Sequence, residues 1–395
     1  MGHRSRRFSI VILVGALTLV VASCSSSKKT TTNTTTGSGT ATNSKSCKSG
    51  LTLGFFGALT GSNSPQLGIN EAQGEQLAID QFNASHSACH IGYTPFDSQG
   101  DPAQAPALAT NAVGEANVVG VIGPAFSGES KAADPIFNQA GLPTITVSAT
   151  NTQLSQMGWT IFHRAVANDD AQGPADANFI ANTLHAKSVA VIDDASAYGK
   201  GLADIVRANL KDAGVTVTSP GSIDLSHNYP ATVNAVKAAN VDVVFYGGYY
   251  TEAGPLALQL KNAGVTATFM SGDGSLAQGF VQGAGDAANG AYLSAPAVFA
   301  LTATADKTFV SQYTAKWGGP PQLYSGEAYD ATNQFLAAIS AGNYTRPTIN
   351  HYISTVPYKG LLKTYSYGAT GELVGTPIIF FHKVVNDQIT LFSQS

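Results

Sequence analysis

Polar side chains that could bind a small molecule follow several apolar runs of this sequence. Ser127 and Thr150 follow two such runs in the first half of the chain, and Tyr198 and Tyr249 follow runs in the second half. A hydroxyl at the start of a helix either caps that helix or lies beside free backbone N–H groups that receive a carboxylate or phosphate. The tyrosines, together with Tyr324, are either ordinary partly buried aromatic residues or the lining of a pocket, and their clustering favours a lining.

Asp273 lies in the run Gly272-Asp273-Gly274-Ser275-Leu276-Ala277, which has the G-x-G-x-x-A spacing of a dinucleotide-binding turn. We reject that function because the Asp273 carboxylate would face a pyrophosphate. In addition, no acidic residue about 20 positions later could bind a ribose hydroxyl. The sequence therefore predicts no nucleotide cofactor.

Catalytic and metal-binding patterns are equally weak. Ser127 is not part of a G-x-S-x-G elbow, and no nearby histidine could act as its base. His86, Cys89 and His90 permit a metal interpretation, but no Cys-x-x-Cys pair or further histidine cluster offers the remaining ligands. We therefore expect no catalytic residue, no metal and no cofactor.

The charge is unevenly distributed along the 395 residues. Seven of the 21 lysines and arginines lie in the first 48 residues, so residues 49–395 carry 14 basic and 25 acidic side chains. Nucleic acids and anionic surfaces are bound by clustered Lys and Arg, so we exclude nucleic acid as a partner. A chain of this length, with 44% apolar residues, is too long for one ordinary core and predicts two lobes.

The first 24 residues have the pattern of an export signal. Basic residues precede an uncharged run, 10–21, whose twelve residues would span about 18 Å as a helix, too short for a hydrocarbon core of about 30 Å. The run ends in Val21-Ala22-Ser23-Cys24, which resembles the bacterial lipobox. We expect residues 1–23 to be a lipoprotein signal peptide and Cys24 to be lipidated; the alternative is a free cysteine after an ordinary cleavage site.

Residues 24–48 contain the expected lipidated cysteine and a tether rich in Ser and Thr that cannot order itself. No later apolar stretch approaches 18 residues, so we expect the protein to lie at the extracytoplasmic face of the membrane, held by its lipid. The two remaining cysteines, Cys47 and Cys89, form an even pair in an exported chain, so we expect a disulfide.

The body alternates short β-rich runs with helical stretches, which predicts two doubly wound parallel sheets. Strands are expected at 51–56, 90–97, 118–123 and 143–148 in the first series, and at 188–194, 216–224, 241–248 and 266–271 in the second. Helices are expected at 70–84, 102–115 and 128–140, and then at 199–213, 229–239 and 251–262. In the tail we expect a helix at 325–341 and strands at 364–367 and 376–385 that complete the two sheets.

From about Leu51 onward the chain resembles the leucine/isoleucine/valine-binding proteins, the type I periplasmic solute receptors of branched-chain amino acid ABC importers. The resemblance depends on short motifs in a fixed order, among them Gly57-Ala58-Leu59-Thr60-Gly61, Val121-Ile122-Gly123-Pro124 with Ser127, Ser148-Ala149-Thr150, Tyr198-Gly199-Lys200-Gly201-Leu202 and Tyr246-Gly247-Gly248-Tyr249. It implies two α/β lobes joined by three crossovers, a hinged central cleft that holds an amino acid, and no catalysis.

The resemblance also implies a role for each site residue. Ser127, the backbone at Ser148 and Ala149, and Thr150 would bind the ligand carboxylate, and Asp273 would face the α-ammonium. Such a zwitterion needs one acceptor and several neutral donors, because closure removes water from both of its charges. Tyr198 and Tyr249 would add contacts from the second lobe. Tyr324 and Leu67 would lie beside the ligand side chain.

Leu67 departs from the best-known relatives, which have tyrosine there, so the ligand could also be another small amphiphile such as an amide, urea or an aromatic acid. With crossovers near Val166, Pro296 and Val374, lobe I would comprise 49–167 plus 298–374, and lobe II 168–297 plus 375–395. The expected partners are an ABC permease and ATPase, and the receptor itself would be a monomer. An exported α/β hydrolase and a sensor ectodomain are the competing classes; the first lacks a nucleophile and base, and the second lacks a later membrane span.

Overall fold

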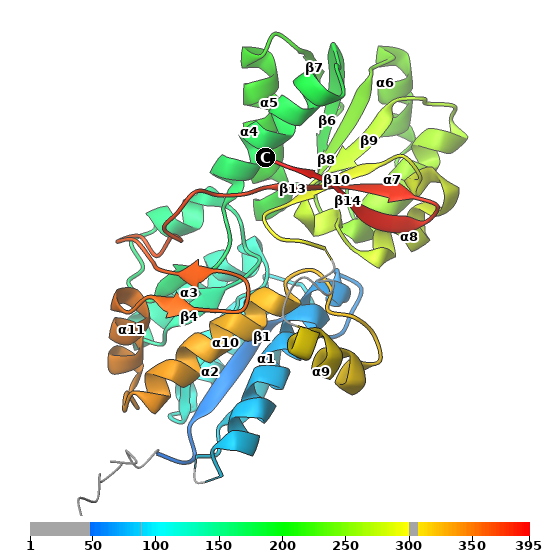
Figure 1. Cartoon of the computed structure of the whole chain (residues 1–395). Coiled ribbons are helices and arrows are strands. Elements are labelled where there is room, and N and C mark those ends of the chain that lie inside the picture. Colours follow the sequence, from blue (N-terminus) through cyan, green and yellow to red (C-terminus); the bar gives the residue numbers. More distant parts are fainter. Residues whose placement is uncertain (1–47, 88, 300–306) are drawn as a thin grey trace, which may run out of the picture. The chain divides into compact units, whose positions relative to one another are not determined.

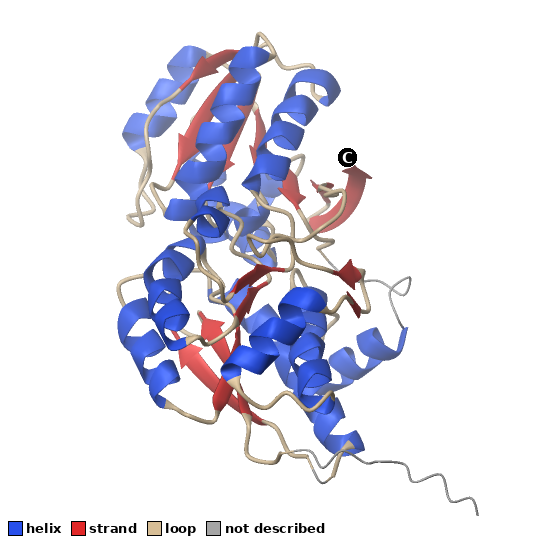
Figure 2. Ribbon diagram, turned by 90° about the vertical axis from the view of Figure 1, so that its left-hand side faces the viewer, coloured by secondary structure: helices blue, strands red, loops and turns tan. Residues whose placement is uncertain are grey.

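The computed structural model describes residues 48–87, 89–299 and 307–395, and it contains two large sheets flanked by helices (Figure 1, Figure 2). The first sheet has the order β2-β1-β3-β4-β5 and is parallel throughout. Its strands are β1 (Thr52–Gly57), β2 (Gly92–Asp97), β3 (Val118–Ile122), β4 (Thr144–Thr146) and β5 (Phe162–Arg164).

Helices cover both faces of this sheet. α1 (Pro65–Ser85) packs against α10 (Ser325–Ser340), and α2 (Ala105–Gly114) packs against α3 (Ser127–Ala140). Alternate residues of β1 enter different cores, because successive side chains of a strand point to opposite faces. Leu53 and Phe55 pack in the core that contains α1 and α10, whereas Phe56 packs in the core that contains α2 and α3. This two-sided burial explains the near-continuous apolar runs of the sequence.

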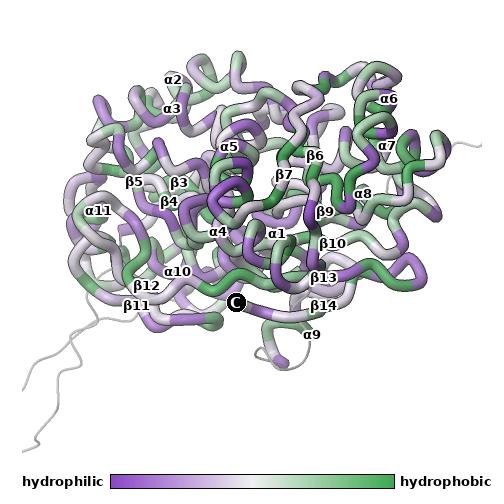
Figure 3. The backbone as a smooth tube through the Cα atoms, turned by 90° about the horizontal axis from the view of Figure 1, so that it is seen from above, coloured by the Kyte–Doolittle hydropathy of each residue, from purple (hydrophilic) through white to green (hydrophobic). Residues whose placement is uncertain are grey.

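The second sheet has the order β14-β13-β10-β9-β8-β6-β7. Its parallel strands are β6 (Ser188–Asp193), β7 (Thr216–Thr218), β8 (Val243–Gly247), β9 (Thr268–Ser271) and β10 (Tyr292–Ala295). The helices around it are α4 (Asp169–Asn178), α5 (Ala197–Asp212), α6 (Pro230–Ala239), α7 (Tyr250–Asn262) and α8 (Gln278–Ala284). Hydrophobic stretches follow these strands through the interior (Figure 3).

The pairing of the C-terminal strands differs from expectation in two respects. The run 376–385 forms β13 (Phe380–Val385), which does join the second sheet, but it pairs antiparallel with β10 and turns back into β14 (Gln388–Gln394). The run 364–367 joins neither large sheet. Its β12 (Thr364–Tyr365) pairs only with β11 (Tyr358–Lys359), so the first sheet is completed by β5 instead.

The chain passes between the two sheets three times. It leaves the first sheet after β5, returns from β10 to α9 (Lys307–Trp317) and α10, and leaves again between β12 and β13, after α11 (Arg346–Thr355) has packed beside β3. In the parts of the chain that the structure describes, no helix is long and apolar enough to cross a membrane.

Gly68 shows how α1 is held at the end of β1. A Cβ on Gly68 would lie 2.0 Å from the backbone oxygen of Ala58, in the loop that follows β1. This close approach needs a residue without a side chain, and it brings the first turns of α1 to the carboxyl end of the sheet.

Gly68→Ala should therefore push α1 away from the sheet and lower the free energy of unfolding by about 1 to 3 kcal/mol. Urea unfolding of the mature domain measures the loss. Gly114→Ala is the matched control, since an added Cβ there meets nothing within 4 Å. Equal stability of the two variants would contradict this account of α1.

Candidate functional site

A small cavity lies between the carboxyl ends of the two sheets and is lined by most of the predicted site. Leu67, Ser127, Ser148, Tyr198, Tyr249, Asp273 and Tyr324 line it, together with Glu71, Ala125, Phe126 and Gly274. Ala149 and Thr150 are buried but do not line it. The cavity holds about 10 Å³ of open space, roughly what a single water molecule requires. The residues that line the cavity therefore pack against one another and leave little open space between them.

The Asp273 carboxyl connects the elements around this cavity. Asp273 follows β9, and its Oδ1 accepts hydrogen bonds from the Tyr198 hydroxyl at 2.8 Å and from Gln172 Nε2 at 3.0 Å. Its Oδ2 accepts from the Tyr324 hydroxyl at 2.8 Å. Tyr198 lies in α5 and Gln172 in α4, whereas Tyr324 precedes α10, which packs beside the first sheet. One carboxyl thus receives donors from elements of both sheets.

Two opposed effects act on Asp273. Burial disfavours its charged form and raises its pKa, whereas the donors Tyr198, Tyr324 and Gln172 favour the charged form and oppose that rise. Burial, together with the charge of Asp273, also raises the pKa of the Tyr198 hydroxyl well above its usual value. The tyrosines therefore stay protonated and act as donors.

Tyr324 reaches Asp273 from an unusual backbone conformation. Its φ is 68°, in the left-handed region that non-glycine residues rarely adopt and that costs of order 1–3 kcal/mol. The side chain is 1% exposed, and its hydroxyl bonds to Asp273. Packing and that hydrogen bond hold a strained residue at the wall of the cavity.

The hydroxyl residues lie near one another, but neither Ser127 nor Thr150 is a helix N-cap. Phe126 occupies the N-cap position of α3, and the short 3-10 helix η1 (Thr152–Gln156) is capped by Asn151. Ser127 Oγ accepts from Asn151 N at 3.3 Å, and Ser148 Oγ donates to the Ala125 oxygen at 2.6 Å. The hydroxyls join two strand-end loops instead of capping helices.

Behind these loops, the buried Arg164 fixes their position. Its Nη1 donates to the backbone oxygens of Ala149 and Asn151, both at 2.8 Å. Its other nitrogens bind Glu372 in the last passage between the sheets, with a closest distance of 2.5 Å. The segment from Ser148 to Asn151 is thereby tied to one of the passages that join the two sheets.

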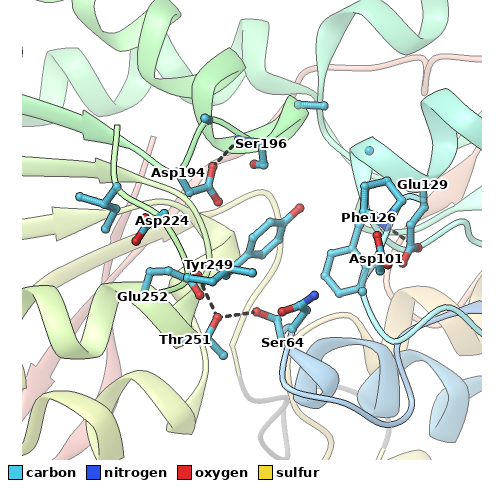
Figure 4. Close-up of a pocket in the computed structure, with 18 residues that line it drawn as sticks. Ser64, Asp101, Phe126, Glu129, Asp194, Ser196, Asp224, Tyr249, Thr251 and Glu252 are labelled. Carbon is cyan, nitrogen blue, oxygen red and sulfur yellow. Dashed lines mark hydrogen bonds between the residues drawn. The ribbon is translucent and has the colours of Figure 1, made fainter. Parts of the chain in front are cut away.

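A second, larger pocket of about 410 Å³ lies next to the cavity (Figure 4). Phe126 and Tyr249 line both spaces, and their rings meet edge to face with centroids 5.2 Å apart. Five acidic residues line this outer pocket and no Lys, Arg or His does, within the described part of the chain: Asp101, Glu129, Asp194, Asp224 and Glu252.

Two features of this site were missed by the sequence analysis. One is the acidic outer pocket, whose acids come from separate loops and from the first turns of α3 and α7 and share no common pattern. The other is Glu71, one helical turn after Leu67 on α1, which lines the inner cavity and is fully buried. Residues four apart share one face of a helix, so the spacing from Leu67 to Glu71 was a usable signal. It was missed because the helix was expected to begin at residue 70, after Leu67.

Other predicted sites lie partly or wholly outside the described residues. Cys24 and Cys47 do so entirely, whereas Cys89 is buried and disulfide-bonded. The pairing of Cys47 with Cys89 stays a prediction. Over 48–87, 89–299 and 307–395, no three His, Cys, Asp or Glu side chains are grouped as metal ligands, and His86 stacks on Phe82 with ring centroids 4.2 Å apart.

This fold and cavity define an α/β protein with two sheets whose carboxyl ends meet over a small, buried cavity lined by polar side chains. A family model described as periplasmic binding protein matches residues 50–386. The chain belongs to this family, and the resemblance to the leucine/isoleucine/valine-binding proteins and the type I fold are confirmed. Such relatives are binding proteins of transporters, so the chain is a binding protein and not an enzyme, and the hydrolase alternative is set aside.

Individual relatives show the extent of the similarity. An "Amino acid binding protein" of Pseudomonas aeruginosa is 35% identical over 227 residues, 57% of this chain and 60% of the relative. The leucine-, isoleucine-, valine-, threonine- and alanine-binding protein of the same organism is 29% identical over 75% of this chain and 80% of its own. The branched-chain amino acid binding protein LivJ of Streptococcus pneumoniae, solved with isoleucine, has a TM-score of 0.79 at 27% identity and covers 87% of this chain and 99% of its own.

Proposed function

We propose that this protein is the lipid-anchored, extracytoplasmic substrate-binding component of an ABC importer, and that it binds a small aliphatic amino acid between its lobes. The observation that carries the proposal is the buried Asp273 carboxyl, which receives tyrosine hydroxyls from both sides of the cavity. A ligand ammonium placed there has a counter-charge, and the Ser127 hydroxyl and the backbone at Ser148 would supply neutral partners for its carboxylate.

The named relatives support an amino acid ligand. One binds leucine, isoleucine, valine, threonine and alanine, and another was solved with isoleucine. Of the other small amphiphiles, an aromatic acid fits least well, because its only charge is negative and the cavity is lined by two carboxyls, Glu71 and Asp273.

Binding in a cavity of about 10 Å³ requires the walls to separate and close again. The proposed lobes, 49–167 plus 298–374 and 168–297 plus 375–395, would turn about crossovers near Val166, Pro296 and Val374. Ligand contacts to both lobes shift the population toward the closed form, which is the form a permease and its ATPase would recognise.

Ligand should raise the thermal stability of the mature domain without being consumed. At a 100-fold excess over the dissociation constant the gain is about 2.7 kcal/mol, enough for a shift of several degrees. A thermal-shift screen with leucine, isoleucine, valine, alanine, phenylalanine and urea identifies the ligand. A response to urea alone would replace the amino acid by an amide-type ligand, and product formation would contradict the binding role.

Asp273→Asn keeps the shape of the side chain and removes its charge. Breaking one side of a desolvated charge pair costs about 2 to 5 kcal/mol, so the affinity for the best amino acid should fall about 30-fold or more, mainly through faster dissociation. Calorimetry measures the loss, and circular dichroism verifies the fold. Asp212→Asn, an exposed Asp at the end of α5, is the control. Affinity within threefold of wild type would show that Asp273 does not receive the ammonium.

Cys24→Ala should release the protein from membranes, because the proposed signal peptide and tether hold it only through lipid on that residue. The measurement is the distribution of the variant between membrane and soluble fractions of the producing bacterium. Because residues 1–47 lie outside the described residues, the structure does not test the anchor, whereas this experiment does. A variant that stays in the membrane fraction would overturn the lipobox interpretation.

A further inference from the structure

The two carboxyls of the inner cavity differ in how far the protein satisfies them. Asp273 accepts three hydrogen bonds from Tyr198, Gln172 and Tyr324. Glu71 lies on α1, is 0% exposed, and neither of its carboxyl oxygens has a hydrogen-bond partner. A buried polar group without a partner is costly, and most such groups in folded proteins are paired.

The nearest possible donor to Glu71 is the Ser148 hydroxyl. It lies close enough to lower the pKa of Glu71, but it donates to the Ala125 oxygen at 2.6 Å. The other neighbours that act on Glu71 are acids, Glu129 on α3 and Glu327 on α10. Within the described residues, no Lys, Arg or His acts on Glu71 appreciably. Because Glu71, unlike the equally buried Glu75, lines the cavity, a molecule in the cavity can supply the missing donor.

We propose that Glu71 is a second ligand-binding carboxyl, on the opposite side of the cavity from the Asp273 loop, and that it receives the ammonium of the ligand together with Asp273. The lining of the cavity supports this, because Glu71 and Asp273 are the two carboxyls among its walls and both are within reach of a ligand held there. The proposal depends on the proposed amino acid ligand and extends it to the way the cationic end is recognised.

The proposed role of Glu71 also implies that ligand binding releases a proton. Burial raises the pKa of Glu71 to about 8, Ser148 opposes the rise, and the charges of Glu129 and Glu327 add to it. The other titratable groups near Glu71 are Glu75 on its own helix and Tyr324 before α10, and Asp273, Tyr198 and Tyr249 across the cavity. At pH 7 Glu71 is therefore mostly protonated, and an arriving ammonium favours its charged form and displaces the proton.

The sign of the pH dependence follows. Below pH 8 an ammonium ligand has to displace the proton of Glu71, so affinity should rise with pH, approaching tenfold per unit between pH 6 and 7, and level off above pH 8. A neutral donor such as urea does not stabilise the charged carboxylate in this way and should bind with little pH dependence. The two kinds of ligand are thereby distinguished.

The experiment is calorimetry with L-leucine, L-valine and L-alanine as separate probes, at pH 7 in two buffers of different ionisation enthalpy. Wild-type protein should release a proton on binding, approaching one per bound amino acid. Glu71→Gln should abolish the release, flatten the pH profile and weaken binding at least tenfold at pH 8. Asp273→Asn should bind more weakly but still release the proton.

Glu75→Gln is the matched control. Glu75 lies one turn further along α1, is equally buried and has no hydrogen-bond partner, but it does not line the cavity. It should leave both affinity and proton release unchanged. If an amino acid binds without proton release, or if Glu71→Gln binds as tightly as wild type at pH 8, the role of Glu71 is wrong. If none of the three amino acids binds, the proposed function itself fails.

Discussion

The structure depends on the buried carboxyl of Asp273, whose hydrogen-bond donors come from elements outside its own loop. Asp273 draws its donors from α4, from α5 and from the residue before α10, so elements built around two different sheets meet at one side chain. Removing a carboxyl from water is unfavourable, and only the complete set of donors makes its burial tolerable. This requirement explains why Tyr324 keeps a left-handed backbone conformation at the cavity wall.

Acidic groups dominate the interior near the cleft. Besides Asp273 and Glu71, burial raises the pKa of Glu129 and of Asp169 to about 8. Arg164, the buried cation nearest to Asp169, is paired with Glu372 and only partly offsets the rise in the pKa of Asp169. A cleft arranged in this way favours a cationic group, because burial keeps these acids largely protonated and an arriving cation stabilises their charged forms.

The sequence predicted the parallel strands well, because strands buried on both faces give apolar runs of a length that turns and helices rarely show. It also placed Ser127, Ser148, Tyr198, Tyr249 and Asp273 near one another, since the carboxyl ends of parallel strands share one edge of a sheet. Short or late elements were harder. The three residues of β5 cannot display an alternation, and the antiparallel direction of β13 depends on the path of a connection. The burial of Glu71 could not be predicted from neighbouring residues, because α10, the helix that packs against α1, comes much later in the chain.

The order of the elements also sets when each half can fold. α1 needs α10 to cover it, and the second sheet is extended by β13 and β14 only at the end of the chain. A ribosome that adds about 5–20 residues per second makes α10 on the order of ten seconds or more after α1. During that interval neither core is complete. A protein destined for the far side of a membrane benefits from this delay, because a secretion channel accepts an unfolded chain and not a finished domain.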